Sequence, residues 1–313
     1  MTYIFFSSDV WMIFVAEEAT AEKRGFYLNV FMAIGIVGPM MSPIFRSIFL
    51  TETAPVTAWR GMTIFPIIIG ITAGIAALAG AKETRLYEEF KLTKVKSEAE
   101  PENVSFVKNM RVLMANPRKK EILAIMVMSI IAGLNFILLQ LGESFITYNV
   151  GLTQGQVNTV ITIIAVAMIV AYLITGKLSD KTGRVPLVYV FSMLLPAATI
   201  LLNLGVIAGS NAVLLVAIGM ILGYTGYYVL WTLLRVILME IVATGRRGTA
   251  SGLRAIIQAI GTTIGFGLGA VISLAWGLGV AFIILSMPMF AIPFLTKKYL
   301  KETKGIKLDT IAD

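Results

Sequence analysis

The side chains that could do chemistry in this chain are carboxylates, guanidinium groups, amines, amides and hydroxyls, because its 313 residues include no cysteine and no histidine. That composition excludes disulfides, thiol nucleophiles, metal sites built from His and Cys, and Ser-His-Asp triads. There is no G-x4-G-K-[ST] phosphate loop, and a G-x-G-x-x-A pattern starting at Gly265 lies in an apolar segment with no predicted strand before it. We therefore expect neither an enzyme nor an ATP-driven pump, and we expect no cofactor and no metal.

The most regular charge spacing is a glutamate followed seven positions later by an arginine, which occurs at Glu17 and Arg24 and again at Glu240 and Arg247. A shift of 223 residues superimposes the two pairs. A tetrapeptide is repeated as well, as K-E-T-R at 82–85 and K-E-T-K at 301–304. Internal repeats of this kind indicate two halves built on one plan.

A third group of charges lies in the run Gly176-Lys177-Leu178-Ser179-Asp180-Lys181-Thr182-Gly183-Arg184. Its glycines permit a tight turn. Its aspartate can face the N-terminus of a helix, where exposed N–H groups favour a negative charge.

Long apolar segments must position these residues. The chain is 57% hydrophobic and only 14% charged, which is far from the composition of soluble domains. A crossing helix needs about 20 apolar residues. Segments of about that length are Thr2 to Ala16 (short), Gly25 to Leu50, Met62 to Ala81, Ile122 to Tyr148, Val157 to Leu178, Pro186 to Ala208, Ala212 to Ile237, Thr249 to Ala275 and Leu278 to Leu295. We predict an all-α, polytopic membrane protein with about nine transmembrane helices.

The basic residues alternate between the two sides of these segments. Of the 26 Lys and Arg residues, 24 lie on one side, and only Arg46 and Arg60 lie on the other. Cytoplasmic loops carry the excess of Lys and Arg, so we predict that Met1 starts outside and that Asp313 lies in the cytoplasm. The net charge of +8 follows from this topology, and we predict no nucleic-acid partner.

The run from Gly176 to Arg184 resembles the G-x-L-x-D-[RK]-x-G-R loop of the major facilitator superfamily. The two E-x6-R turns resemble those after the family's fourth and tenth helices, and K-E-T-K-G at 301–305 is similar to the P-E-T-K-G tail of its sugar-porter branch. Family members hold their solute between two six-helix halves. The resemblance covers helices four to twelve, so it implies the major facilitator fold without its first three helices.

This resemblance implies four segments. They are a partial N-terminal half of three helices at 1–81, a cytoplasmic linker at 82–120, a six-helix C-terminal half at 121–296 and a cytoplasmic tail at 297–313. We expect a solvated linker that contains one interfacial helix around Met110. The repeat places three further helices upstream of Met1, and we expect an N-terminally truncated chain.

The resemblance also implies a conformational latch. In it, Asp180 and Arg184 pack against the start of the second span, near Arg24, and lose that contact when the halves rock. The latch residues are Gly176, Asp180, Lys181, Gly183, Arg184, Glu17, Arg24, Glu240 and Arg247.

Polar and ionisable side chains inside the spans are candidates for solute and proton binding, because they are costly in a membrane. Asp9 lies about 12 Å from the cytoplasmic boundary at the helical rise and is the best proton-coupling candidate. Four aromatic residues share one helical stripe, although helix packing is the alternative role for each tyrosine. The candidate solute or proton residues are Asp9, Asn135, Gln140, Tyr224, Tyr227, Tyr228, Trp231 and Gln258.

We predict a secondary active transporter in the plasma membrane. It would move a small solute, such as a sugar or an organic acid, together with protons by alternating access. Its partners would be that solute, protons and membrane lipid, with a second copy or a missing N-terminal fragment completing the first half. The alternative is a truncated remnant without transport activity of its own, or a fragment that needs a partner. A membrane enzyme or sensor is disfavoured because no catalytic motif is present.

Overall fold

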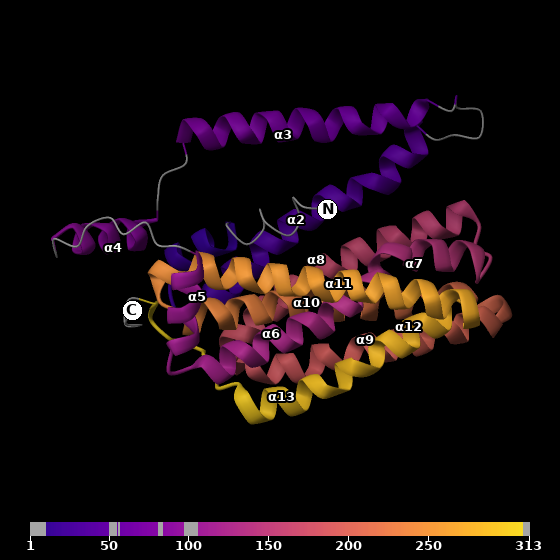
Figure 1. Cartoon of the computed structure of the whole chain (residues 1–313). Coiled ribbons are helices and arrows are strands. Elements are labelled where there is room, and N and C mark those ends of the chain that lie inside the picture. The colour runs from indigo at the N-terminus through magenta and orange to yellow at the C-terminus, as the bar shows by residue number, and fades with distance from the viewer. Residues whose placement is uncertain (1–10, 50–54, 56, 81–83, 97–105, 309–313) are drawn as a thin grey trace.

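Helices and short 3-10 turns form the fold. The computed structural model describes residues 11–49, 55, 57–80, 84–96 and 106–308 (Figure 1). No strand occurs among them, so the prediction of an all-α protein is confirmed. Residues 11–18 are helical. The α-helices that follow are α2 (Arg24–Phe49), α3 (Gly61–Gly80), α4 (Arg85–Lys96), α5 (Phe106–Ala115), α6 (Lys119–Leu134), α7 (Phe136–Tyr148), α8 (Gln154–Thr182), α9 (Val185–Ile207), α10 (Ala212–Ile241), α11 (Arg247–Trp276), α12 (Leu278–Ser286) and α13 (Ala291–Tyr299).

Eight helical segments of the described chain are long and apolar enough to cross a membrane. They coincide with the last eight of the nine predicted spans. The first predicted span, Thr2 to Ala16, falls mostly outside the described residues, and only its last part belongs to the helix of residues 11–18. The ninth crossing therefore stays a prediction.

Two of the eight spans are interrupted, which their hydropathy did not reveal. Lys119–Tyr148 consists of α6 and α7, which meet at Asn135. The Asn135 backbone N–H bonds the carbonyl three residues back, as in a 3-10 turn. The last span consists of α12, the 3-10 turn η4 (Met287–Phe290) and α13, with Pro288 inside the turn. Proline has no backbone N–H and ends a regular helix.

The segment predicted as a solvated linker contains two helices. One of them, α5, is the helix expected around Met110. Its Leu113 is buried and belongs to the main apolar core. The other helix, α4, was not expected, and it follows Thr84, which is buried too. The linker is therefore ordered at both of its ends and joined to the bundle there.

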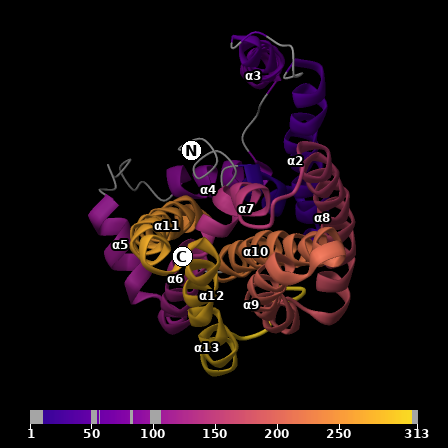
Figure 2. The same ribbon diagram turned by 90° about the vertical axis from the view of Figure 1, so that its right-hand side faces the viewer.

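Close helix contacts build the bundle of α6 to α13 (Figure 2). Helices α6 and α11 approach so closely that a Cβ on Gly261 would lie 2.4 Å from the Ile130 carbonyl oxygen, and one on Gly265 would lie 2.4 Å from the Leu134 carbonyl oxygen. A stripe of small residues at four-residue spacing permits this approach between membrane helices.

Helix α3 stands apart from this bundle in both views (Figures 1 and 2). None of its most apolar window is buried, and isoleucines such as Ile64 and Ile71 are more than half exposed. An apolar surface of this extent suits a lipid environment. Helix α2 connects α3 to the rest, because its first half packs on α8.

Candidate functional site

The last turn of α8 binds the start of α2. The Asp180 carboxylate accepts hydrogen bonds from the backbone N–H groups of Gly25, at 2.9 Å, and Phe26, at 2.8 Å. These N–H groups lie in the first turn of α2, where they have no partner within the helix. A Cβ on Gly25 would lie 2.6 Å from Asp180 Oδ1, so glycine is needed for this approach.

Glycines at the end of α8 keep the two helices close. A Cβ on Gly176 would lie 2.9 Å from the Cβ of Asn29 and 3.0 Å from the Cα of Phe26, both in α2. Gly183 has a φ of 104°, which L side chains rarely adopt, and it ends α8. Lys181 is exposed, and its carbonyl accepts a hydrogen bond from the Lys304 ammonium group at 2.7 Å.

The two E-x6-R turns exchange partners. Arg24 Nη1 lies 3.0 Å from Glu240 Oε1, and Arg247 Nη1 lies 2.9 Å from Glu17 Oε1. Each arginine thus pairs with the glutamate of the other repeat, and all four side chains are almost completely buried. The pairs tie the first helices of the chain to α10 and α11.

The supporting contacts repeat as well. Each arginine Nε donates to the carbonyl of the residue before its own glutamate, Arg24 to Ala16 at 3.1 Å and Arg247 to Met239 at 3.2 Å. Each glutamate Oε2 accepts from the threonine of a K-E-T tetrapeptide, Glu17 from Thr84 and Glu240 from Thr303. The internal repeat of the sequence therefore appears in space as a crossed network.

Arg184 joins this network to the last turn of α8. Its Nη2 lies 3.1 Å from Glu240 Oε1 and 3.3 Å from Asp180 Oδ1, and the side chain is fully buried. Glu302 accepts hydrogen bonds from the backbone N–H groups of Arg184 and Val185, at the start of α9. We call the four buried side chains of the crossed pairs, with Asp180 and Arg184, the crossed ion network. Removing one partner of a buried ion pair typically costs about 3–5 kcal/mol, because the other charge is left unpaired, so the arrangement of this network is sensitive to the loss of any one member.

Three of the predicted solute residues lie together deeper in the bundle. Gln258 Nε2 donates to the Tyr227 hydroxyl at 2.9 Å, and the Tyr227 and Trp231 ring centroids are 6.3 Å apart. Two fully buried arginines complete the group: Arg254 Nη1 donates to Gln258 Oε1 at 2.6 Å, and Arg235 stacks on Trp231.

Arg235 and Arg254 are among the 24 basic residues that the charge pattern assigns to the cytoplasmic side, and that assignment stays a prediction. Both side chains are buried inside the bundle, within α10 and α11. A signal was present, because Arg235 precedes Glu240 by five residues and Arg254 follows Arg247 by seven, which places both inside predicted spans. Near the end of a span, however, an arginine side chain can also extend to the membrane–water interface. Hydropathy alone does not distinguish such an arginine from a buried one.

Of the other predicted solute residues, Tyr228 lies beside this group, with its ring centroid 6.0 Å from that of Trp231, and Tyr224 follows it at 6.3 Å. The Tyr224 hydroxyl donates to the Leu139 carbonyl at 2.7 Å, which ties α10 to α7. The Tyr228 ring lies edge-on to Tyr227, at 5.4 Å. The Asn135 amide is buried and donates within its own helix, Gln140 is exposed on α7, and Asp9 lies outside the described residues.

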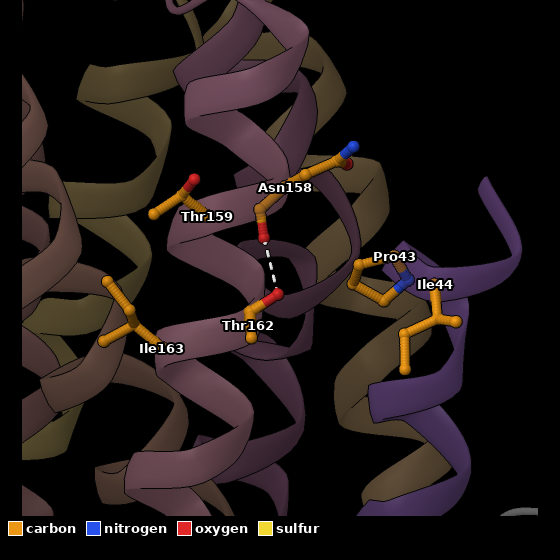
Figure 3. A pocket seen from close by; sticks show the side chains of 6 residues that line it. All are labelled: Pro43, Ile44, Asn158, Thr159, Thr162 and Ile163. Atoms are coloured by element: carbon orange, nitrogen blue, oxygen red, sulfur yellow. Dashed lines mark hydrogen bonds between the residues drawn. The ribbon is translucent and has the colours of Figure 1, made fainter. Parts of the chain in front are cut away.

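An open hollow of about 390 Å³ lies between the far ends of α2 and α8 (Figure 3). It is lined by Pro43, Ile44, Asn158, Thr159, Thr162 and Ile163. The α2 and α8 helices touch near Gly25 and Gly176. A second open hollow, of about 340 Å³, lies beside this contact next to Lys177 and Asp180, so hollows occur at both ends of the helix pair. At the far, outer ends of the pair, Arg46 forms a partly exposed ion pair with Glu143 of α7.

These features define a polytopic membrane protein in which helices from the two ends of the sequence are locked together at one end of the bundle. The chain matches the Major Facilitator Superfamily over residues 123–308. Since that match covers more than half of its length, the chain belongs to this superfamily, whose members are secondary transporters of small solutes. A comparison with curated proteins gave no match.

Proposed function

We propose that this protein couples the movement of a small solute, such as a sugar or an organic acid, to protons and works by alternating access. The observation that carries the proposal is the crossed ion network at one end of the bundle. It is accompanied by an open hollow between the outer ends of α2 and α8 (Figure 3). The buried ion pairs, and not the hollows, mark the closed side of such a transporter, because open hollows occur at both ends of α2 and α8.

The charge pattern supports an orientation. The loops that carry most of the Lys and Arg lie at the same end of the helix bundle as the crossed ion network. Loops rich in Lys and Arg are cytoplasmic. We therefore assign the closed end to the cytoplasm and the plasma membrane as the site of action. The conformation is then open toward the outside, and breaking the network opens the inner side.

In this proposal Glu17, Arg24, Glu240 and Arg247 form the inner gate, and the loop from Gly176 to Arg184 is its latch. Rocking one group of helices against the other would separate Asp180 from the N-terminus of α2. Asp9 is our candidate for the proton-binding carboxylate, because ionisable groups within a span are costly and mark ion pathways.

Solute uptake into proteoliposomes tests the proposal. The purified chain is reconstituted and supplied with labelled sugars, organic acids and cationic drugs, with and without an imposed proton gradient. We expect saturable uptake of at least one solute, and we expect a protonophore to abolish it. Uptake that is saturable but indifferent to the protonophore would reject the proton coupling alone. A lack of saturable uptake of every solute would reject transport by this chain.

A further inference from the structure

An open apolar hollow lies between the helix of residues 11–18 and the first part of α2. Its volume is about 470 Å³, and aromatic and aliphatic side chains of both helices line it. Several of these residues are well exposed: Phe14 by 37%, Tyr27 by 45% and Ile34 by 66%. Tyr27, Ile34 and Gly38 follow one another after seven and four positions, so they share one side of α2. We call Phe14, Tyr27, Phe31, Ile34 and Gly38 the open face.

The second half of the chain contains the same pair of helices with this face covered. The shift of 223 residues places the helix of residues 11–18 on the end of α10, and α2 on α11. The equivalence holds in space as well, because the crossed ion network repeats its hydrogen bonds at that shift. Phe14 and Tyr27 correspond to Ile237 and Ala250, which are almost completely buried. A surface that is exposed in one half is therefore an interface in the other.

Helix α6 provides the cover in the second half. It packs on both α10 and α11. Its backbone lies against two glycines of α11, because a Cβ on Gly261 or on Gly265 would lie 2.4 Å from a carbonyl oxygen of α6. These glycines correspond to Gly38 and Ser42, so α2 keeps small residues at both positions. A Cβ on Gly38 would have no atom of the described residues within 4 Å. The open face thus has the small residues of this contact without the helix.

The contact also defines a direction. Gly261 approaches Ile130 and Gly265 approaches Leu134, so α6 runs parallel to α11. A helix on the open face would run parallel to α2 in the same way. A second copy of the chain would offer its exposed helix α3 (Figures 1 and 2), but α3 follows α2 as the next span and runs in the opposite direction. The repeat therefore favours a helix other than α3.

We propose that the open face binds an apolar transmembrane helix of a partner polypeptide, in the position that α6 takes on α10 and α11. The properties of that helix follow from those of α6, which has no charged residue from Ile122 to Leu134. It also carries a small residue at the contact, Gly133, whose Cβ would lie 2.4 Å from the Gln258 carbonyl oxygen. Close packing of small residues drives helix association in lipid, where the hydrophobic effect is absent.

Binding of a peptide to the whole chain in liposomes tests the proposal. The probe is a synthetic peptide of residues 119–148, which contains α6 and is long enough to cross the membrane. It carries a fluorescent donor at its N-terminus. The acceptor is attached to Lys23→Cys, an exposed position near the start of α2 in a chain without native cysteine. We expect saturable energy transfer. Solute is absent, so the result is independent of the transport function.

Substitutions locate the contact. Gly38→Leu should weaken binding of the peptide by about tenfold, because the added side chain occupies the place of the incoming helix. Gly133→Leu in the peptide should have a similar effect. Gly267→Leu in α11 is the matched control, since it adds the same side chain at an exposed glycine outside this contact. It should leave binding unchanged. Both chain variants should keep the melting temperature of the parent, which separates loss of binding from loss of folding.

Three results would overturn the proposal. One is energy transfer that does not saturate with the peptide. Another is saturable transfer of equal strength with Gly38→Leu and with the parent, which would place the peptide elsewhere on the chain. The third is transfer between donor-labelled and acceptor-labelled copies of the chain that Gly38→Leu abolishes, because it would assign the open face to a second copy.

Discussion

Glu240 of α10 lies 3.0 Å from the guanidinium group of Arg24, at the start of α2, and neither side chain is accessible to solvent. The two residues are separated by 216 positions in the sequence. Their contact matters because it joins the two ends of the chain, and because the equivalent pair of Glu17 with Arg247 repeats it. In the proposed inner gate, both ion pairs must break before the gate opens. Substitutions can therefore weaken the two pairs one at a time.

Glu240→Gln should shift the protein toward a conformation open at the cytoplasmic end. The substitution leaves the buried Arg24 and Arg184 without the carboxylate that they share, at a cost of about 3–5 kcal/mol to the closed arrangement. The measurement is maleimide labelling of Thr175→Cys, a buried position of α8, in a chain that has no native cysteine. We expect faster labelling than in the parent.

Glu121→Gln is the matched control for this experiment. Glu121 is nearly buried and pairs with Arg118, but the pair lies at the start of a single helix. Its loss should lower the melting temperature without exposing Thr175→Cys. Equal labelling rates in the Glu240→Gln variant and the parent would contradict a gating role for Glu240.

Asp180→Asn should alter the balance between conformations more than it alters folding. The aspartate places a full negative charge at the N-terminus of α2. Such a charge is worth about 0.3–1 kcal/mol when exposed and up to about 2 kcal/mol when partly buried. An asparagine oxygen can still accept one of the two hydrogen bonds. The expected result is normal expression with a changed labelling rate at the same Thr175→Cys reporter.

Glu302→Gln offers a comparison with the same chemistry in another place. Glu302 binds the backbone N–H groups at the start of α9, so it connects the tail to a neighbouring helix and leaves α2 untouched. We expect lower thermal stability and an unchanged labelling rate. If Asp180→Asn and Glu302→Gln changed the labelling rate equally, a latch specific to Asp180 would have to be abandoned.

The fold class and the surroundings of Asp180 could be predicted because they depend on local signals. Apolar length defines a span, and an aspartate among glycines in the run from Gly176 to Arg184 indicates a side chain that faces a helix end. The turn itself is shorter than expected, because α8 continues to Thr182. The exchange of partners between Glu17 and Glu240 could not be predicted. A repeat shows that two turns are alike, but pairing within a turn and pairing across turns leave the same pattern in the sequence.

The burial of Arg235 and Arg254 could not be predicted, for a different reason. Arg235 and Arg254 lie near the ends of long apolar segments, where an arginine commonly extends to the interface. Only the tertiary contacts with Trp231 and Gln258 show that both turn inward. The break at Asn135 was missed similarly, because a polar residue within an apolar run changes its hydropathy very little.

Gly261→Ala should lower the thermal stability of the protein. The added methyl group would lie 2.4 Å from the Ile130 carbonyl oxygen, so α6 and α11 would have to separate. Overpacking of this kind costs about 1–3 kcal/mol. Gly267→Ala in the same helix meets no atom within 4 Å and should leave the melting temperature unchanged or slightly higher, since alanine favours helix. Equal melting temperatures for the two variants would show that the close approach of α6 and α11 is unnecessary.

The proposed orientation predicts which loops an impermeant thiol reagent reaches from outside intact cells. Lys181→Cys and Gly209→Cys place single cysteines at exposed positions at opposite ends of α9. We expect external labelling of Gly209→Cys only, with Lys181→Cys labelled after the membrane is permeabilised. Labelling of Lys181→Cys from outside would invert the topology and would also place the crossed ion network at the outer end.

The outer ion pair should contribute to gating more than to stability. Arg46 and Glu143 join α2 to α7 at the end opposite the crossed ion network, and both side chains remain partly exposed. Pairs of this kind are worth about 0–1 kcal/mol and weaken with salt. We expect Glu143→Gln to change the melting temperature very little, yet to raise the labelling rate of Val160→Cys, a buried position of α8 between Thr159 and Thr162, which line the hollow in Figure 3. High salt should raise the rate in the parent and not in the variant, because the variant has no pair left to screen. An increase with salt of equal size in both proteins would mean that the pair does not restrict this hollow.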